Sequence, residues 1–158
     1  MITETQVSLM EIAGLSPADS FPRMELLGQS LPKALKDWRI NLSNVLQYPN
    51  LSTKESRLLA FAVALNESNT RLSASFEQQA LETGASLEEI AEIQACVAIM
   101  KMNNVFYRFR HFVPKEEYEK TPAGLKMSVL LNPVLGKAFF ELVSLVISAL
   151  NGCERCVQ

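Results

Sequence analysis

The chain has 158 residues, 48% of them hydrophobic, and its 15 basic and 17 acidic residues give a formal net charge of −2. This length is enough for one substantial core and too short for two independent ones. The charges form no long run of one sign, which argues against nucleic acid or an anionic membrane as a partner. No apolar stretch reaches the roughly 18 residues that a spanning helix needs, and residues 1–20 lack the pattern of a signal peptide. We therefore expect a cytoplasmic protein.

The N-terminal part of the chain carries glycine and proline at short intervals, so we expect at most short, interrupted helices there. We interpret residues 1–30 as an N-terminal arm and residues 31–158 as one helical domain. From Pro32, apolar residues recur at helical spacing until Tyr48-Pro49-Asn50 stops the helix. Ser52 or Thr53 then caps a second helix.

The rest of the chain continues in the same way. The sequence predicts a third helix over about 70–82 and a fourth that starts at the capping box of Ser86 and runs for some twenty residues. A connection over 107–122 follows, with one helical turn around 116–118. The last two predicted elements are a fifth element over 122–131 and a very apolar helix over 136–150. No segment shows the alternation of apolar and polar residues, bounded by hairpin turns, that is typical of β-strands. The predicted fold class is therefore all-α.

Two of the three cysteines, Cys153 and Cys156, stand in a Cys-x-x-Cys spacing directly after the helix stop Asn151-Gly152. If Cys153 opens a new helix, both sulfurs face one side and can form a disulfide. The helix start and Arg155 would favour the thiolate, whereas Glu154 would oppose it.

The spacing alone leaves three interpretations open: a redox dithiol, half of a metal site, or coincidence. A closed zinc site needs four ligands, and the remaining cysteine and the single histidine are Cys96 and His111. Cys96 lies in the apolar fourth helix and is interpreted as a small buried side chain. His111 is interpreted as a hydrogen-bonded loop residue, with a proton carrier or ligand as the alternative.

Glu141 interrupts the otherwise apolar helix over 136–150. A carboxylate among apolar residues is costly unless it is paired or functional. One interpretation places it on a solvated stripe beside Lys137, four residues earlier. The other returns it to the cysteines, if the helix that follows folds back. Asn103 and Asn104, which interrupt an apolar run in the fourth helix, are assigned to a helix kink or a subunit contact.

Three segments carry a family resemblance: MKMNNVFYRFRHF from Met100, GLKMSVLLNP from Gly124 and KAFFELVSLVISALNGCERC from Lys137. They resemble the core of the alkylhydroperoxidase D (AhpD) family, within the carboxymuconolactone decarboxylase-like superfamily, and weaker similarity reaches back to Leu31. The resemblance implies an AhpD-like helical fold and an antioxidant enzyme that reduces alkyl or hydrogen peroxides with a Cys-x-x-Cys pair.

The family motif is Glu, eleven residues, Cys, one residue, His, Cys, three residues, His. The resemblance implies Glu141 as the relay carboxylate, Cys156 as the thiol that attacks peroxide and Cys153 as its disulfide partner. Arg155 replaces the first histidine, and the second would fall after Gln158. Arginine cannot shuttle protons near neutral pH, so the relay is incomplete. We expect either a longer protein that supplies the C-terminal part or a degenerate site.

The resemblance also implies partners. These are the peroxide, a lipoamide-linked or thioredoxin-like thiol reductant, a peroxiredoxin, and further copies of the chain in a trimer or an assembly of trimers. No cofactor and no metal are expected, because cysteine oxidation supplies the electrons. The alternative function is a catalytically weak, helical interaction module in which the relay has decayed.

Overall fold

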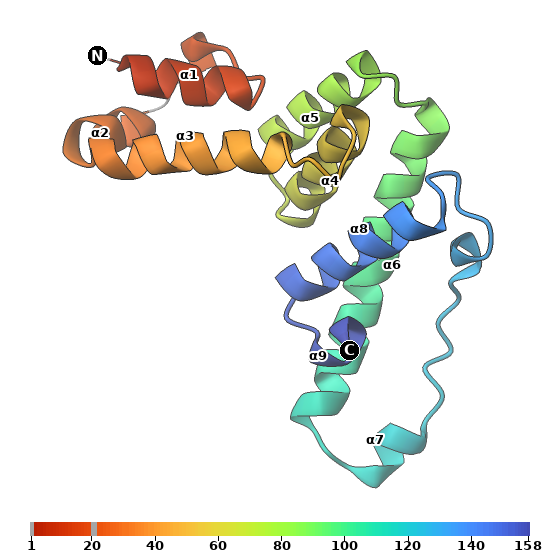
Figure 1. Ribbon diagram of the computed structural model, residues 1–158. Helices are drawn as coiled ribbons and strands as arrows, with labels where there is room; N and C mark the ends of the chain where they lie inside the picture. The colour runs from red at the N-terminus through yellow and green to blue at the C-terminus, as the bar shows by residue number, and fades with distance from the viewer. Residues whose placement is uncertain (1, 20–21) are drawn as a thin grey trace.

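A computed structural model of the chain describes residues 2–19 and 22–158 (Figure 1). Within these residues every regular element is helical, which confirms the all-α class. The elements are α1 (Glu4–Ile12), η1 (Pro17–Asp19), α2 (Pro22–Ser30), α3 (Pro32–Leu46), α4 (Thr53–Asn66), α5 (Thr70–Glu82), α6 (Leu87–Phe112), α7 (Glu116–Lys120), η2 (Ser128–Leu130), α8 (Lys137–Leu150) and α9 (Glu154–Val157).

The N-terminal residues form two helices of nine residues each, α1 and α2, which pack against each other and against α3. The fully buried Gln6 donates from Nε2 to the carbonyl oxygen of Met24. A Cβ on Gly28 would meet the terminal amide of the Gln6 side chain at 2.4 Å, so a larger residue there would displace that side chain. The expected short, interrupted helices are thus confirmed, while a domain boundary at residue 30 stays a prediction.

Two expectations about the middle of the chain were wrong. The connection expected from residue 107 begins only at Val113, because α6 continues through the aromatic and basic run to Phe112. The Arg110 guanidinium lies 4.3 Å from the centre of the Phe106 ring one turn earlier, and this contact supports the added turns. The element expected over 122–131 is reduced to the 3₁₀ turn η2, whose start has no side-chain cap.

The core lies where α4, α5, α6 and α8 meet (Figure 1). Its fully buried side chains include Leu58, Phe61, Ile93, Phe140 and Val143. Helix α8 packs on α6, and α9 follows against the C-terminal half of the same helix. The long helix α6 is therefore the support on which the C-terminal cysteines rest.

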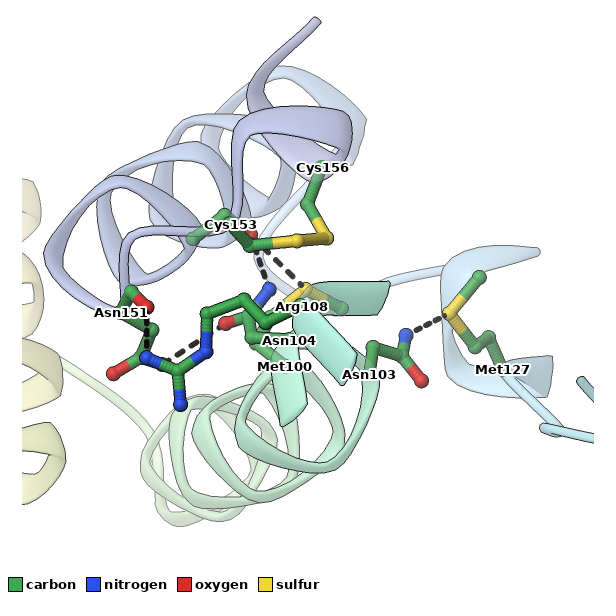
Figure 2. Close-up of a disulfide and its surroundings, with 9 residues drawn as sticks. Met100, Asn103, Asn104, Arg108, Met127, Asn151, Cys153 and Cys156 are labelled. Atoms are coloured by element: carbon green, nitrogen blue, oxygen red, sulfur yellow. Dashed lines mark hydrogen bonds between the residues drawn. A yellow bond between two sulfur atoms is a disulfide. The ribbon is translucent and has the colours of Figure 1, made fainter. Parts of the chain in front are cut away.

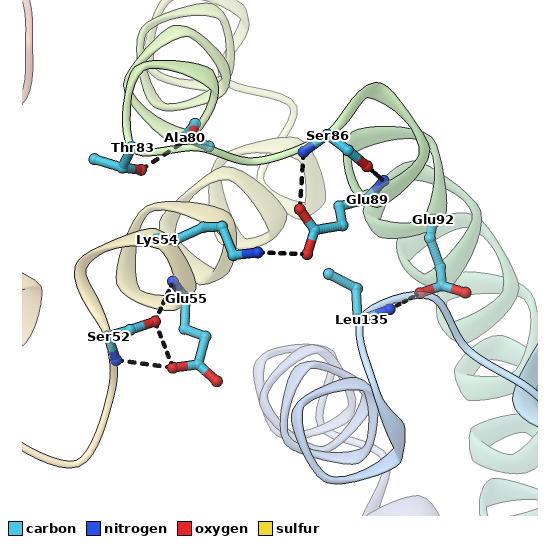
Figure 3. Close-up of polar contacts among 9 residues, drawn as sticks. All are labelled: Ser52, Lys54, Glu55, Ala80, Thr83, Ser86, Glu89, Glu92 and Leu135. Atoms are coloured by element: carbon cyan, nitrogen blue, oxygen red, sulfur yellow. Dashed lines mark hydrogen bonds and ion pairs between the residues drawn. The ribbon is translucent and has the colours of Figure 1, made fainter.

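Two capping boxes start helices α4 and α6 (Figure 3). Hydrogen bonds from the Ser52 hydroxyl and amide lower the pKa of Glu55. Burial raises the pKa of Glu89, but the Lys54 ammonium at 2.7 Å and the Ser86 amide together outweigh it, so that pKa is lowered. The Lys54–Glu89 pair also ties the start of α4 to the start of α6.

Glu92 fastens the loop before α8 to helix α6 (Figure 3). Its buried carboxylate accepts hydrogen bonds from the amides of Val134, at 2.9 Å, and Leu135, at 2.7 Å. These bonds fix where α8 begins.

We expect Glu92→Ala to lower the free energy of unfolding by about 2 kcal/mol, because two backbone donors lose a charged acceptor. Urea unfolding followed by circular dichroism measures the change. Gln94→Ala, at an exposed position of the same helix, is the matched control and should change stability by less than about 0.5 kcal/mol. Equal effects of the two substitutions would contradict the role of Glu92.

Candidate active site

The turn after α8 places Cys153. Gly152 has φ +65°, and its amide donates to the carbonyl of Ala149 at 3.0 Å. The Cys153 amide donates back to the carbonyl of Ser148, also at 3.0 Å. This pair of bonds around a left-handed glycine is the Schellman termination of a helix. The predicted stop at Asn151-Gly152 is thus confirmed, and its geometry folds Cys153 back onto the last turn of α8.

Cys153 and Cys156 form a disulfide, with Cα atoms 5.3 Å apart. Cys153 precedes α9, and the Cys156 amide donates to its carbonyl at 3.0 Å, so one helical turn brings the sulfurs together. The two cysteines differ in exposure: the Cys153 residue is 1% exposed, whereas Cys156 is half-buried. A reagent from solution therefore has better access to the Cys156 sulfur.

A polar network lies beneath the disulfide (Figure 2). Asn104, 1% exposed on α6, donates from Nδ2 to the Ser148 hydroxyl at 3.1 Å and accepts from Nδ2 of Asn151 at 2.9 Å. The Asn151 side-chain oxygen in turn accepts from Nδ2 of Asn66 on α4 at 3.1 Å. Three helices are thus joined at the turn that carries Cys153.

Arg108 contributes a charge to the same place. One of its terminal nitrogens donates to the backbone carbonyl of Asn151 at 2.7 Å (Figure 2). Its Nε is buried and has no hydrogen-bond partner among the described residues. The cation therefore lies on the carbonyl of the C-cap residue of α8, at the helix end where a positive charge is favourable.

A small cleft of about 130 Å³ opens beside the disulfide. It is lined by Tyr107, Arg108, His111, Phe112, Gly152, Cys153, Glu154 and Arg155. His111 Nε2 lies 3.9 Å from a Glu154 carboxylate oxygen, and the Arg155 guanidinium lies 5.7 Å from the centre of the Tyr107 ring. The cleft is large enough for a few heavy atoms and combines aromatic faces with charged groups.

The structure brings Cys153, Cys156 and Arg155 together but not Glu141. Glu141 lies in the second turn of α8 and is separated from the end of that helix by about 2.5 turns. Its carboxylate is exposed and lies 3.8 Å from the Lys137 ammonium, four residues earlier. This is the solvated arrangement that the sequence offered as one interpretation. A relay role for Glu141 stays a prediction.

Cys96 is the buried structural side chain that its apolar surroundings predicted. Its Sγ lies 3.5 Å from the Ser144 hydroxyl. Burial raises the pKa of the Cys96 thiol, and Glu92 adds to this, against a smaller lowering by Ser144. The thiol is therefore protonated at neutral pH and unreactive.

Of three residues near the site that the sequence interpretation covered, His111 is the one whose surroundings it predicted wrongly. Asn103 donates to the Met127 sulfur, and Asn104 belongs to the network under the disulfide; a helix kink or a subunit contact at these two residues stays a prediction. His111 is no loop residue, since it stands in the last turn of α6 and lines the cleft. Arg108 was not singled out. The four-residue spacing of Asn104 and Arg108, which puts both on one helix face, was the available signal.

Among the described residues, no group of three or more histidine, cysteine, aspartate or glutamate side chains is arranged to hold a metal ion. The same part of the chain contains no helix with the length and apolar character needed to cross a membrane. Neither finding bears on the disulfide itself.

The fold and this turn define an all-helical protein with a Cys-x-x-Cys disulfide at the end of its most apolar helix. Proteins named alkyl hydroperoxide reductase AhpD are similar to it. The one from Bradyrhizobium sp. (strain ORS 278) is 40% identical over 135 residues, which cover 85% of this chain and 74% of that protein. The one from Coxiella burnetii (strain Dugway 5J108-111) is 41% identical over 133 residues, 81% of this chain and 73% of that protein.

A third relative, from Anaeromyxobacter dehalogenans (strain 2CP-1 / ATCC BAA-258), carries the same name and is 40% identical over 138 residues, 85% of this chain and 72% of that protein. No family model matches the chain. The extent and level of these similarities nevertheless place the chain in the AhpD family of alkyl hydroperoxide reductases.

Proposed function

We propose that the protein is a thiol-dependent peroxidase that reduces alkyl or hydrogen peroxides through Cys153 and Cys156. The observation that carries the proposal is the disulfide between a buried Cys153 and a more accessible Cys156. This difference in exposure fits a reaction in which the Cys156 thiol reacts with the peroxide and the buried Cys153 thiol then forms the disulfide. Membership of a family whose members are named for alkyl hydroperoxide reduction supports the same chemistry.

The reaction uses both thiols. The Cys156 thiolate attacks one oxygen of the peroxide ROOH, the O–O bond breaks, and the leaving alkoxide takes a proton to give the alcohol ROH. Cys156 is then a sulfenic acid. The Cys153 sulfur attacks the sulfenic sulfur, and hydroxide leaves and takes the Cys153 proton to give water. Two thiols have supplied two electrons, and the products are ROH, water and the Cys153–Cys156 disulfide.

The cycle requires an external dithiol that reduces the disulfide by thiol–disulfide exchange. We assign this role to a lipoamide-linked or thioredoxin-like donor, and a peroxiredoxin is a further partner. Such donors place the protein in the reducing cytoplasm. The proposal includes a homo-oligomer, a trimer or an assembly of trimers. Exposed apolar side chains at position 31, the N-cap of α3, and at positions 38 and 45 within α3 support association between copies.

A stoichiometric peroxide pulse tests the function. We expect the reduced protein to lose two free thiols per chain on addition of one equivalent of cumene hydroperoxide, with one equivalent of alcohol formed. Cys96→Ser should lose the same two thiols, because Cys96 is buried and protonated. Thiols are counted with Ellman's reagent under denaturing conditions, and the alcohol by chromatography.

A specific observation favours the alternative function, an oligomeric interaction module with a degenerate relay. Glu141 is paired with Lys137, and the relay histidine between the cysteines is replaced by the exposed Arg155. In this case the peroxide pulse would leave the thiol count unchanged and form no alcohol. The same experiment therefore decides between the two functions.

A further inference from the structure

Two residues of helix α6 form hydrogen bonds with residues at the C-terminal end of helix α8. Asn104 and Arg108 are four residues apart, so they project from the same face of α6. Asn104 holds the side chains of Ser148 and Asn151, and Arg108 holds the Asn151 backbone carbonyl at 2.7 Å (Figure 2). The Ser148 carbonyl accepts from the Cys153 amide at the start of the turn, and Asn151 is the C-cap residue within it. The position of Cys153 is thus set from α6.

The charge on Arg108 also has an electrostatic consequence for the cysteines. The carbonyl groups at the C-terminus of α8 carry partial negative charge, and Cys153 follows this terminus after two residues. Partial negative charge disfavours a thiolate. The guanidinium on the Asn151 carbonyl offsets it and places a full positive charge on the wall of the cleft that also contains Cys153. Helix α9 has only one turn, so few aligned amides assist.

Four other polar groups face the same cleft: Tyr107 and His111 from α6, and Glu154 and Arg155 from α9. His111 and Glu154 are exposed to solvent and lie 3.9 Å apart, and solvent screens the Glu154 charge. Arg155 is exposed and directed to the Tyr107 ring, where solvent screens its charge. Arg108 is less exposed and is fixed by a hydrogen bond. Of the two arginines, it has the more persistent position.

We infer that Arg108 is a positioning residue for the Cys153–Cys156 pair: it fixes the Asn151–Cys153 turn and favours the dithiol over the disulfide. The inference rests on the proposed function only in taking the pair as a working dithiol. A cation that stabilises the thiolate stabilises the reduced form, and the disulfide becomes more oxidising. The external reductant then reduces it more readily.

The test is the thiol–disulfide equilibrium of the full chain in glutathione buffers, together with the pH profile of iodoacetamide alkylation at Cys156. We expect Arg108→Gln to shift the equilibrium about fivefold toward the disulfide and to move alkylation to higher pH, because the charge at the helix end is lost. Arg108→Lys keeps the charge without the planar fork and should shift the equilibrium by about twofold. Arg155→Gln should have a smaller effect than Arg108→Gln.

Lys33→Gln, an exposed cation on α3, is the charge-matched control and should leave both measurements unchanged. An Arg108→Gln protein with a native circular dichroism spectrum and an unchanged equilibrium overturns the inference, and so does an equal shift in Lys33→Gln. If Arg108→Gln does not fold, Arg108→Lys decides, and an equilibrium equal to that of the parent overturns it. A parent that consumes no peroxide but shows the Arg108 shift refutes the proposed function and leaves this inference standing.

Discussion

Cys156→Ser is expected to lower peroxide consumption with a dithiol donor by on the order of 10³-fold or more, since a hydroxyl is not ionised at neutral pH and the attacking sulfur is gone. Cys153→Ser should behave differently. Cys156 remains accessible, so a single equivalent of peroxide should still be reduced, but the reaction should stop at the sulfenic acid. In Cys153→Ser, steady-state turnover therefore falls, while the reduction of the first equivalent of peroxide still takes place.

Two measurements separate the variants: the burst of alcohol in a single turnover, and trapping of sulfenic acid with dimedone followed by mass spectrometry. Cys96→Ser is the matched control and should retain turnover, because that thiol is buried against Ser144 and has a raised pKa. Trapped sulfenic acid at position 153 in Cys156→Ser, with none at 156 in Cys153→Ser, would show that the two roles are reversed.

Features set by neighbouring residues were predictable from the sequence. The N-cap of α4, left open between Ser52 and Thr53, the capping box at Ser86 and the stop at Asn151-Gly152 each depend on residues within one helical turn. The structure has all three. The Cys-x-x-Cys spacing belongs to the same group, since one turn of helix is enough to bring both sulfurs together.

Features that depend on distant residues were not predictable. Asn104 meets Asn151 across 47 residues, and Arg108 meets the same residue across 43. The four-residue spacing of Asn104 and Arg108 indicates that they share a face of their helix, but no local pattern shows which distant residues that face meets. The length of α6 was misjudged for a related reason. Its basic and aromatic end is polar in composition, but Arg110 is buried and donates to the Thr121 carbonyl.

The placement of Glu141 bears directly on how protons are moved at the site. Its carboxylate pairs with Lys137 at the far end of α8, and the arginine between the cysteines has no acid–base function near neutral pH. With neither Glu141 nor Arg155 placed to carry protons at the cysteines, the groups left within the described residues are the nearby charges, the turn geometry and His111 on the wall of the cleft. Proton transfer is the step that we expect to limit turnover.

Arg155→His should therefore increase peroxide turnover, by up to about 10²-fold, because imidazole titrates near neutral pH and supplies general acid–base catalysis beside Cys156. The smaller histidine side chain can be accommodated at this position, because Arg155 is exposed to solvent. The rate should gain a pH dependence centred near the ordinary histidine pKa, about 6.5. Arg155→Gln, which removes the charge without adding a proton carrier, is the control and should not gain activity.

If Glu141 joins a relay, Glu141→Gln should slow the histidine variant more than the parent. Steady-state assays of the four proteins across pH 5 to 9, roughly the range that imidazole titration spans, measure both effects. Equal turnover of Arg155→His and Arg155→Gln at every pH would show that proton transfer at this position does not limit the reaction.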